Sequence, residues 1–248
     1  MSSQQKLSSF KAIGFDVMGT LLDERVGIYE AFSPIHQYLQ SSQTADTVQK
    51  GYNEALSYHM RNSPPGTSYQ NIMIQAHRQV SEELSHGQYV PSREESLAFS
   101  KALAEWPAWW DTVQALQTLA EGSKLVLVSN MDTEVLEKIV STGALREVRF
   151  AALIGSDKSR AFKPDQQVNQ TLLDTVKNDF GISKDQVLLV AQGTGSDHIP
   201  ARDMGIASAW IDRYDQGQDV LEELGLEPAW TFKSLKELVE ERGRTEDR

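Results

Sequence analysis

Five short apolar runs recur along this chain, and a turn and then a segment of helical spacing follow each of them. The runs are residues 12–15, 125–128, 150–154, 187–190 and 207–211. None of them alternates strictly between apolar and polar residues, as a strand with one face in water does. Apolar strands linked by segments long enough for a crossover helix are typical of parallel sheets. The sequence therefore predicts a doubly wound, Rossmann-like α/β domain.

One long stretch lacks such a run. Between residues 24 and 105, helical spacing occurs in the segments 27–40, 46–61, 69–85 and 93–106. The sequence Ser63-Pro-Pro-Gly66 separates two of these segments, because Pro and Gly interrupt helices. We therefore predict a helical cap, residues 24–106, inserted after the first strand of a core formed by residues 10–23 and 107–248.

The composition excludes several classes of protein. The 248 residues include no cysteine, so a disulfide framework, a thiol nucleophile and a cysteine-bound metal are excluded. With 35 acidic and 24 basic side chains, the formal net charge is −11, which argues against binding to nucleic acid or to an anionic membrane. No run approaches the ~18 apolar residues of a membrane span, and residues 1–9 lack the apolar core of a signal peptide. We expect a cytoplasmic monomer or homodimer that acts on a small molecule.

Polar residues follow the predicted strands at the point where each strand ends. Asp16 directly follows the first strand, and the loops after the later strands contain Ser129, Asn130, Lys163 and Asp197. Because the carboxyl ends of parallel strands share one edge of the sheet, we expect these side chains to converge there. Two carboxylates, a lysine and a hydroxyl–amide pair would then form a reactive site.

These residues belong to four short motifs. In chain order the motifs are Phe15-Asp-Val-Met-Gly-Thr-Leu-Leu-Asp23, Ser129-Asn130, Lys163-Pro164-Asp165 and Gly195-Ser-Asp197. Together they resemble the motifs of the haloacid dehalogenase (HAD) superfamily, in the family's order and with a helical insert after the first. The resemblance covers nearly the whole chain and implies an aspartate-dependent hydrolase.

The resemblance implies that Asp16 is a nucleophile, which forms an ester with the substrate that water then hydrolyses. A cation such as Lys163 beside this carboxyl would favour its charged form. The Thr20 hydroxyl can bond one of the carboxylate oxygens. Asp197 would hold Lys163 in place or orient the hydrolytic water.

Several of these residues also have a structural interpretation. Ser129 and Asn130 could donate to charge on the substrate or leaving group, cap the following helix, or do both. For Asp197 we favour the site role, and the alternative is to cap a helix predicted at residues 199–204. His198 titrates near neutrality and is either a general base or an exposed or capping histidine. These alternatives stay open at the level of sequence.

The chain departs from the HAD phosphatases two positions after the nucleophile. Phosphatases have a second Asp there, whereas this chain has Met18, which cannot transfer a proton and would instead line the substrate site. Where the fourth motif of phosphatases commonly opens with Gly-Asp, this chain reads Gln192-Gly-Thr-Gly195, which leaves Asp197 as its only acid. Because magnesium prefers hard oxygen ligands, we expect no metal or other cofactor, and magnesium is disfavoured. The 2-haloacid dehalogenases also lack the second acid and are metal-independent.

The resemblance to the 2-haloacid dehalogenases is incomplete. That branch holds the substrate carboxylate with a cap Arg, but residues 51–60 contain none and Arg61 lies farther along. Its fourth motif offers Ser and Asn where this chain has Gln192 and Thr194. The leading prediction is a 2-haloacid dehalogenase-like hydrolase that acts on a carbon electrophile. The alternatives are acid–base chemistry on a larger neutral metabolite (a rearrangement or epoxide opening), a magnesium-dependent phosphatase, and a catalytically silent binding protein.

Overall fold

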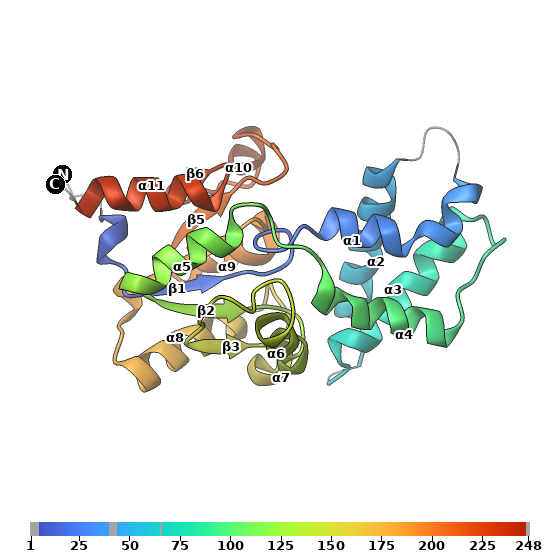
Figure 1. Cartoon of the computed structure of the whole chain (residues 1–248), viewed down its shortest axis with the longest axis horizontal. Helices are drawn as coiled ribbons and strands as arrows, with labels where there is room; N and C mark the ends of the chain where they lie inside the picture. Colours follow the sequence, from blue (N-terminus) through green and yellow to red (C-terminus); the bar gives the residue numbers. More distant parts are fainter. Residues whose placement is uncertain (1–4, 40–43, 65, 247–248) are drawn as a thin grey trace. The chain divides into compact units, whose positions relative to one another are not determined.

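The chain divides into two compact units. The core unit comprises Met1–Leu22 and Ala108–Arg248, and the cap unit is Asp23–Pro107. The computed structural model describes residues 5–39, 44–64 and 66–246 (Figure 1). Outside these ranges lie residues 1–4, which belong to the N-terminal segment 1–9 discussed above, and Gln40, the last residue of the expected helix 27–40.

The core is built on one six-stranded sheet. Its strands are β1 Ala12–Phe15, β2 Lys124–Val128, β3 Ala152–Ile154, β4 Val187–Ala191, β5 Ala207–Ile211 and β6 Trp230–Phe232. They lie in the order β3-β2-β1-β4-β5-β6, and every neighbouring pair is parallel. All residues of β1 are buried, which explains its uninterrupted apolar run. The predicted doubly wound α/β fold is confirmed.

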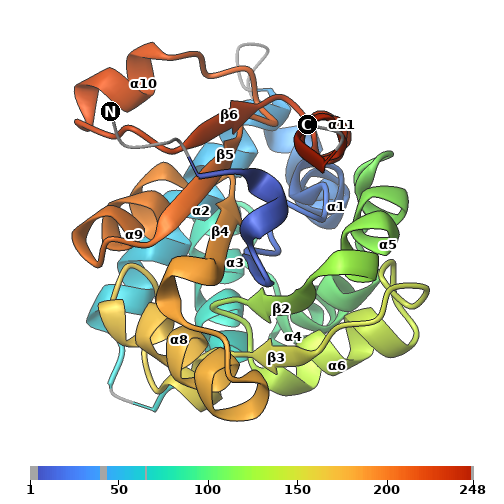
Figure 2. The same cartoon turned by 90° about the vertical axis from the view of Figure 1, so that its left-hand side faces the viewer.

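Helices cover both faces of this sheet. They are α5 Thr112–Gly122, α6 Thr133–Ser141, α7 Ser156–Ser159, α8 Gln166–Phe180, α9 Ile199–Asp203, α10 Asp219–Glu223 and α11 Leu235–Glu246. α8 and α9 lie on one face, while α5 and α11 pack together on the other (Figure 2). α8 approaches β1 so closely that a Cβ atom on Gly14 would lie 2.7 Å from Leu172 Cδ2. This close approach explains the glycine in a buried strand.

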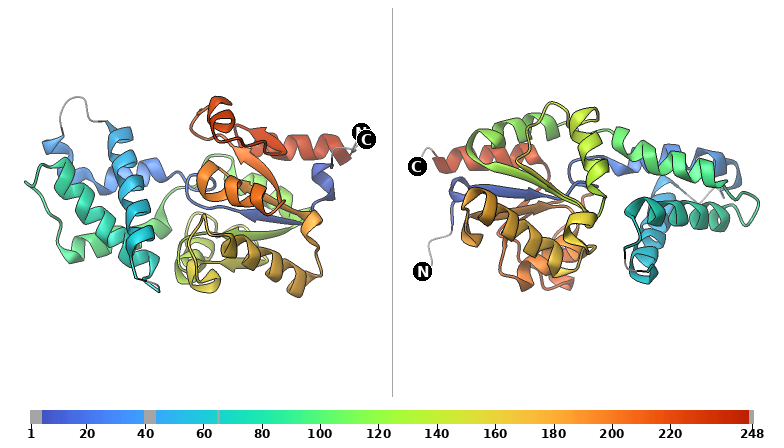
Figure 3. Two further views of the ribbon diagram at one scale, coloured as in Figure 1. Left: turned by 180° about the vertical axis from the view of Figure 1, so that it is seen from behind. Right: turned by 90° about the horizontal axis from the view of Figure 1, so that it is seen from below.

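All secondary-structure elements in the described part of the cap are helices or 3-10 turns. Its α-helices are α1 Glu24–Ala31, α2 Ala45–Asn62, α3 Tyr69–Leu84 and α4 Arg93–Ala102. α3 packs against both α2 and α4 (Figure 3). Between the helices, the rings of Phe32, Tyr52 and Phe99 meet edge to face, and His77 stacks on Phe99 with a centroid distance of 4.5 Å. The cap therefore has an aromatic core of its own.

Two expectations about individual elements were wrong in detail, and one strand was missed. The segment 27–40 does not form one helix, because α1 ends at Ala31 and the 3-10 turn Ser33–Tyr38 follows. Pro34 explains the break, since it has no amide hydrogen and disfavours the α conformation of the residue before it. The expected strand 150–154 begins only at Ala152. β6 was not predicted, because three residues are too short a run to show a period.

Candidate active site

Lys163 lies between two carboxylates. Its Nζ atom is 2.7 Å from Asp16 Oδ1 and 2.6 Å from Asp197 Oδ1. The side chains of Lys163, Asp16 and Asp197 are 5%, 12% and 2% exposed. Asp16 directly follows β1, Asp197 follows β4, and Lys163 lies in the loop between α7 and α8, in the connection that follows β3. The structure thus brings three predicted site residues together at the carboxyl edge of the sheet.

The loop after β1 folds back onto Asp16. Thr20 Oγ1 donates to Asp16 Oδ2 over 2.7 Å and accepts a hydrogen bond from the Gln192 amide over 2.8 Å. Gly19 permits this turn with a φ of 73°, a conformation that few other residues adopt. The Asp16 amide donates to Val190 O in β4 over 3.0 Å. Both carboxylate oxygens of Asp16 are therefore bonded, which holds the carboxylate in one orientation.

The charges at this centre shift the pKa values of its groups. Burial raises the pKa of Asp16. The charge of Lys163 opposes this upward shift, and the carboxylate of Asp197 adds to it. Burial alone would lower the pKa of Lys163, but the two carboxylates outweigh it and raise that pKa. Lys163 is therefore protonated, and the centre carries one net negative charge when both carboxylates are ionised.

Asp197 belongs to a π-helical turn, Thr194–His198. Its Oδ2 atom accepts the Ser196 hydroxyl over 2.5 Å. Gly193 allows this turn to fold tightly, since a Cβ atom there would lie 2.2 Å from Ser196 Oγ and 2.7 Å from Asp197 Oδ2. The N-cap of α9 is His198, so Asp197 does not have the capping role that was its alternative.

Asn130 supports the lysine loop from the end of β2. Its Oδ1 atom accepts the backbone amide of Lys163 over 2.7 Å. The neighbouring Ser129 Oγ accepts the Met131 amide over 3.2 Å and is buried. The N-cap of α6 is Asp132, so neither Ser129 nor Asn130 caps that helix. Asn130 thus contacts the loop that carries Lys163.

The remaining predicted residues are less directly involved. Met18 and Thr194 are half-buried in the core unit. The Gln192 side chain donates to Gln216 Oε1 over 3.1 Å, so only its backbone contacts Thr20. Arg61 is exposed in the last turn of α2 and belongs to the cap unit.

His198 is not placed to act as a general base. Its Nε2 atom is 3.0 Å from Ala191 O, a pure acceptor, so Nε2 donates, and Nδ1 accepts from Ser208 Oγ over 2.9 Å. Burial lowers the pKa of His198, although the bond to Ala191 opposes this shift. The ring is neutral and 1% exposed, so the alternative of an exposed histidine is also wrong.

Three side chains that contact the site loop were not predicted. Trp109, Thr112 and Arg213 donate to main-chain carbonyls of residues 19–21. No motif identifies a side chain whose partner is a backbone carbonyl. For Arg213 the sequence offered one indication, its position: it lies two residues after the end of β5, at the carboxyl edge of the sheet.

The side chains at this centre do not fit a magnesium ion. The ammonium of Lys163 occupies the position between the two carboxylates. Met18 has no carboxylate to add to the two present, and it offers only its main-chain carbonyl oxygen. Among residues 5–39, 44–64 and 66–246, no three His, Asp or Glu side chains cluster as metal ligands. A divalent cation would have to displace a bonded ammonium and would gain few hard oxygen ligands.

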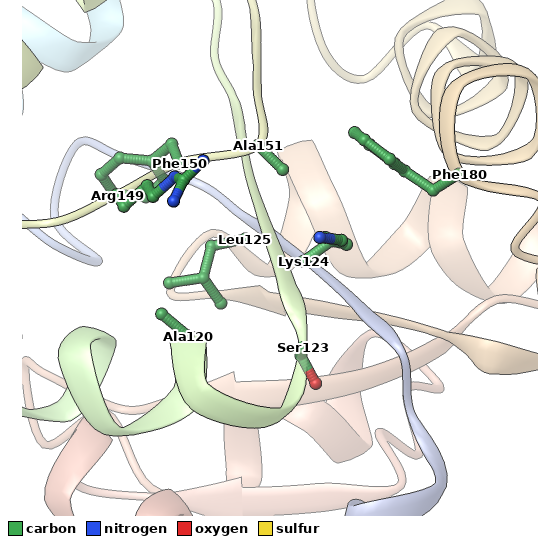
Figure 4. Close-up of a pocket in the computed structure, with 8 residues that line it drawn as sticks. All are labelled: Ala120, Ser123, Lys124, Leu125, Arg149, Phe150, Ala151 and Phe180. Atoms are coloured by element: carbon green, nitrogen blue, oxygen red, sulfur yellow. The ribbon is translucent and has the colours of Figure 1, made fainter.

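A pocket of about 360 Å³ lies at the other end of the sheet (Figure 4). Lys124, Arg149, Phe150 and Phe180 are among its lining residues. Lys124 is the first residue of β2, so the pocket lies at the amino edge, away from Asp16. Ligands of open α/β sheets bind at the carboxyl edge. The pocket is therefore separate from the candidate active site.

The fold is shared with solved hydrolases. An L-2-haloacid dehalogenase from Xanthobacter autotrophicus with chloropropionic acid covalently bound is 19% identical, with a TM-score of 0.74 over 93% of this chain and 97% of that one. A defluorinating L-2-haloacid dehalogenase is 21% identical, with a TM-score of 0.72 over 95% and 97%. The HAD-hydrolase YfnB from Bacillus subtilis, bound to magnesium, is 15% identical, with a TM-score of 0.70 over 92% and 96%.

Comparison of the sequence with curated proteins and with family models gives the following results. No curated protein matches the chain. None of the helices described here has the length and apolar character to cross a membrane. The cytoplasmic location and the oligomeric state stay predictions. One family model, haloacid dehalogenase-like hydrolase, matches residues 10–190, a range that contains the first three of the four motifs and ends within β4. By this match the chain belongs to the haloacid dehalogenase-like hydrolases.

Proposed function

We propose that Asp16 is the nucleophile of a hydrolase that attacks a carbon electrophile in a small molecule, as in the 2-haloacid dehalogenases. The observation that carries the proposal is the bonding of Asp16, whose Oδ1 atom contacts Lys163 at 2.7 Å and whose Oδ2 atom accepts Thr20 at 2.7 Å. Each oxygen keeps a lone pair for attack. Lys163 favours the charged form that attack requires.

The residue at position 18 supports carbon chemistry over phosphate-ester hydrolysis. The leaving oxygen of a phosphate ester needs a proton, and a general acid normally supplies it. Met18 has no proton to give. A halide leaves as a stable anion and needs no proton. The site is therefore better suited to a leaving group of that kind.

The reaction takes two steps. An oxygen of Asp16 forms a bond to the substrate carbon, and the leaving group departs with the bonding electron pair. Water then adds to Cγ of the ester, and the bond between Cγ and the substrate-bound oxygen breaks. Asp197, held by Lys163 and Ser196, accepts a proton from this water. That proton passes to the departing alkoxide, and the second proton of the water is released to solvent.

Single turnover in oxygen-18 water tests this route. The probes are 2-chloropropionate and its neutral amide, with halide release measured with and without EDTA. We expect the label in the peptide that contains Asp16, halide release that EDTA does not change, and no turnover by Asp16→Asn. Asp179→Asn, an exposed residue in α8, is the matched control and should remain active. Turnover by Asp16→Asn, or wild-type turnover that leaves Asp16 unlabelled, would contradict the proposal.

The net charge of the centre favours a second candidate, a neutral substrate. Asp16, Lys163 and Asp197 together carry one negative charge, which repels a substrate carboxylate. A neutral electrophile meets no such repulsion. We therefore expect a higher kcat/KM for 2-chloropropionamide than for 2-chloropropionate. The opposite order would remove this candidate and leave the nucleophile in place.

A further inference from the structure

We propose that Trp109, Thr112 and Arg213 are positioning residues, here called the carbonyl clamp, that hold the loop after β1 in its reactive geometry. The proposal rests on the proposed role of Asp16. The three side chains donate to three successive main-chain carbonyls: Trp109 Nε1 to Gly19 O over 3.1 Å, Arg213 Nε to Thr20 O over 3.1 Å, and Thr112 Oγ1 to Leu21 O over 3.0 Å. Such consecutive bonding leaves this stretch of backbone little freedom to move.

Thr20 connects the clamp to the reactive carboxylate. Its carbonyl accepts from Arg213, and its hydroxyl donates to Asp16 Oδ2 over 2.7 Å. Holding the carbonyl in place also holds the Thr20 side chain, and with it the direction of the hydroxyl. A hydrogen bond to the charged form lowers the pKa of a carboxyl, and here it acts against burial. The clamp thus controls both the orientation and the ionisation of Asp16.

The clamp is itself held rigidly. Arg213 forms an ion pair with Asp111 at 2.8 Å, and the two side chains are 3% and 2% exposed. The Arg213 guanidinium also lies 5.2 Å from the centre of the Trp109 ring. The other oxygen of Asp111 accepts the Lys236 amide over 3.1 Å. Because Arg213 and Trp109 are each anchored by a further contact, the clamp is pre-organised rather than adaptable.

Two mild substitutions test the clamp. Trp109→Phe keeps an aromatic ring but loses the N–H donor, and Thr112→Val keeps the shape of the side chain but loses the hydroxyl. We expect each to lower kcat for 2-chloropropionamide about tenfold with KM unchanged, because small misplacements of a reacting group are costly. The pKa of Asp16 should rise, so the acid limb of the kcat/KM profile should move to higher pH.

Two further measurements separate positioning from simple stability. The pKa of Asp16 is followed directly by carbon-13 NMR of labelled aspartate carboxyls, which needs no turnover. Trp230→Phe makes the same substitution in β6, and neither kcat nor this pKa should change. Arg213→Lys keeps the charge beside Asp111 and should retain more activity than Arg213→Gln, which leaves that carboxylate unpaired. If the Arg213 variants fail to fold, Trp109→Phe and Thr112→Val decide the question.

The outcomes distinguish this proposal from the proposed function. Unchanged kcat and an unchanged Asp16 pKa in both Trp109→Phe and Thr112→Val would overturn the clamp, even if both variants lose thermal stability. Asp16 would remain the nucleophile in that case, provided that Asp16→Asn is inactive. If Asp16→Asn retains turnover, the proposed function fails. In that case the NMR titration alone decides on the clamp. An Asp16 pKa that is raised in Trp109→Phe and Thr112→Val would support the clamp, and an unchanged pKa in both variants would overturn it.

Discussion

Replacing Lys163 with methionine should destabilise the core, and the size of the loss should depend on pH. Lys163 contacts two buried carboxylates, Asp16 at 2.7 Å and Asp197 at 2.6 Å. At an effective dielectric constant of about 20, each contact represents about 6 kcal/mol of gross Coulomb attraction. The variant also escapes the cost of burying the ammonium, so the net loss is smaller. We expect the free energy of unfolding to fall by about 3–5 kcal/mol at pH 7.5.

Acid should reverse much of this loss in Lys163→Met. Without the ammonium, burial and repulsion by Asp197 raise the pKa of Asp16 in the folded protein further above its value in the unfolded chain. The folded state then binds a proton more readily than the unfolded state, so stability increases as the pH falls through the raised pKa. The gain is about 1.4 kcal/mol for each pH unit while only the folded state binds that proton. Urea unfolding at pH 7.5 and pH 5 measures it, each against the wild type.

A second variant identifies the cause of the loss. Lys163→Met combined with Asp197→Asn leaves Asp16 as the one charge of the three at this centre, so this double variant should recover a large part of the stability at pH 7.5. A loss below about 1 kcal/mol at pH 7.5, or an equal loss at pH 7.5 and pH 5, would refute this reasoning. Asp197→Asn alone keeps the pair of Asp16 with Lys163 and completes the cycle, which gives the coupling between Lys163 and Asp197.

Three smaller predictions concern other parts of the chain. Gly193→Ala should abolish most turnover and cost about 1–3 kcal/mol in a thermal melt, because the new Cβ atom would lie 2.7 Å from Asp197 Oδ2. Burial lowers the pKa of His77 to about 4, so wild-type stability should decrease as the pH falls below about 6.5, by about 2 kcal/mol at pH 5. Urea unfolding of His77→Leu should lack this pH-dependent component. Ser92→Ala should cost about 1 kcal/mol of unfolding free energy, because Ser92 Oγ accepts the Glu95 amide over 3.1 Å at the start of α4, and unchanged urea midpoints would contradict it.

The sequence predicted well those features that follow from a local pattern of residues, namely the buried strands and the polar side chains at their ends. β1 and β4 are buried along their whole length, so uninterrupted apolar runs indicated them. Asp16, Lys163 and Asp197 follow strand ends, and the parallel topology brings strand ends together. The rule for parallel sheets was therefore sufficient to predict this convergence before any distance was known.

The features that sequence missed depend on contacts between side chains and backbone. Arg213 reaches Thr20 O, and the sequence contains no sign of a bond to a carbonyl 193 positions away. His198 adjoins a site residue, yet its ring binds Ser208 and Ala191 instead. Adjacency along the chain does not determine where a side chain points in a tight turn such as Thr194–His198. Such residues are identified only when the turn geometry is known.

The missing acid at position 18 and the shared lysine are explained by a single charge balance. With an aspartate at position 18, the centre would contain three carboxylates and one ammonium, a net charge of −2 that a divalent cation neutralises. With Met18, the net charge is −1, and a single ammonium already contacts both remaining carboxylates. On the proposed mechanism this is an advantage, because Asp16 must keep enough charge density to attack carbon. A divalent cation bound directly to Asp16 would withdraw that density, whereas the hydrogen bond from Lys163 orients the carboxylate and leaves a lone pair free.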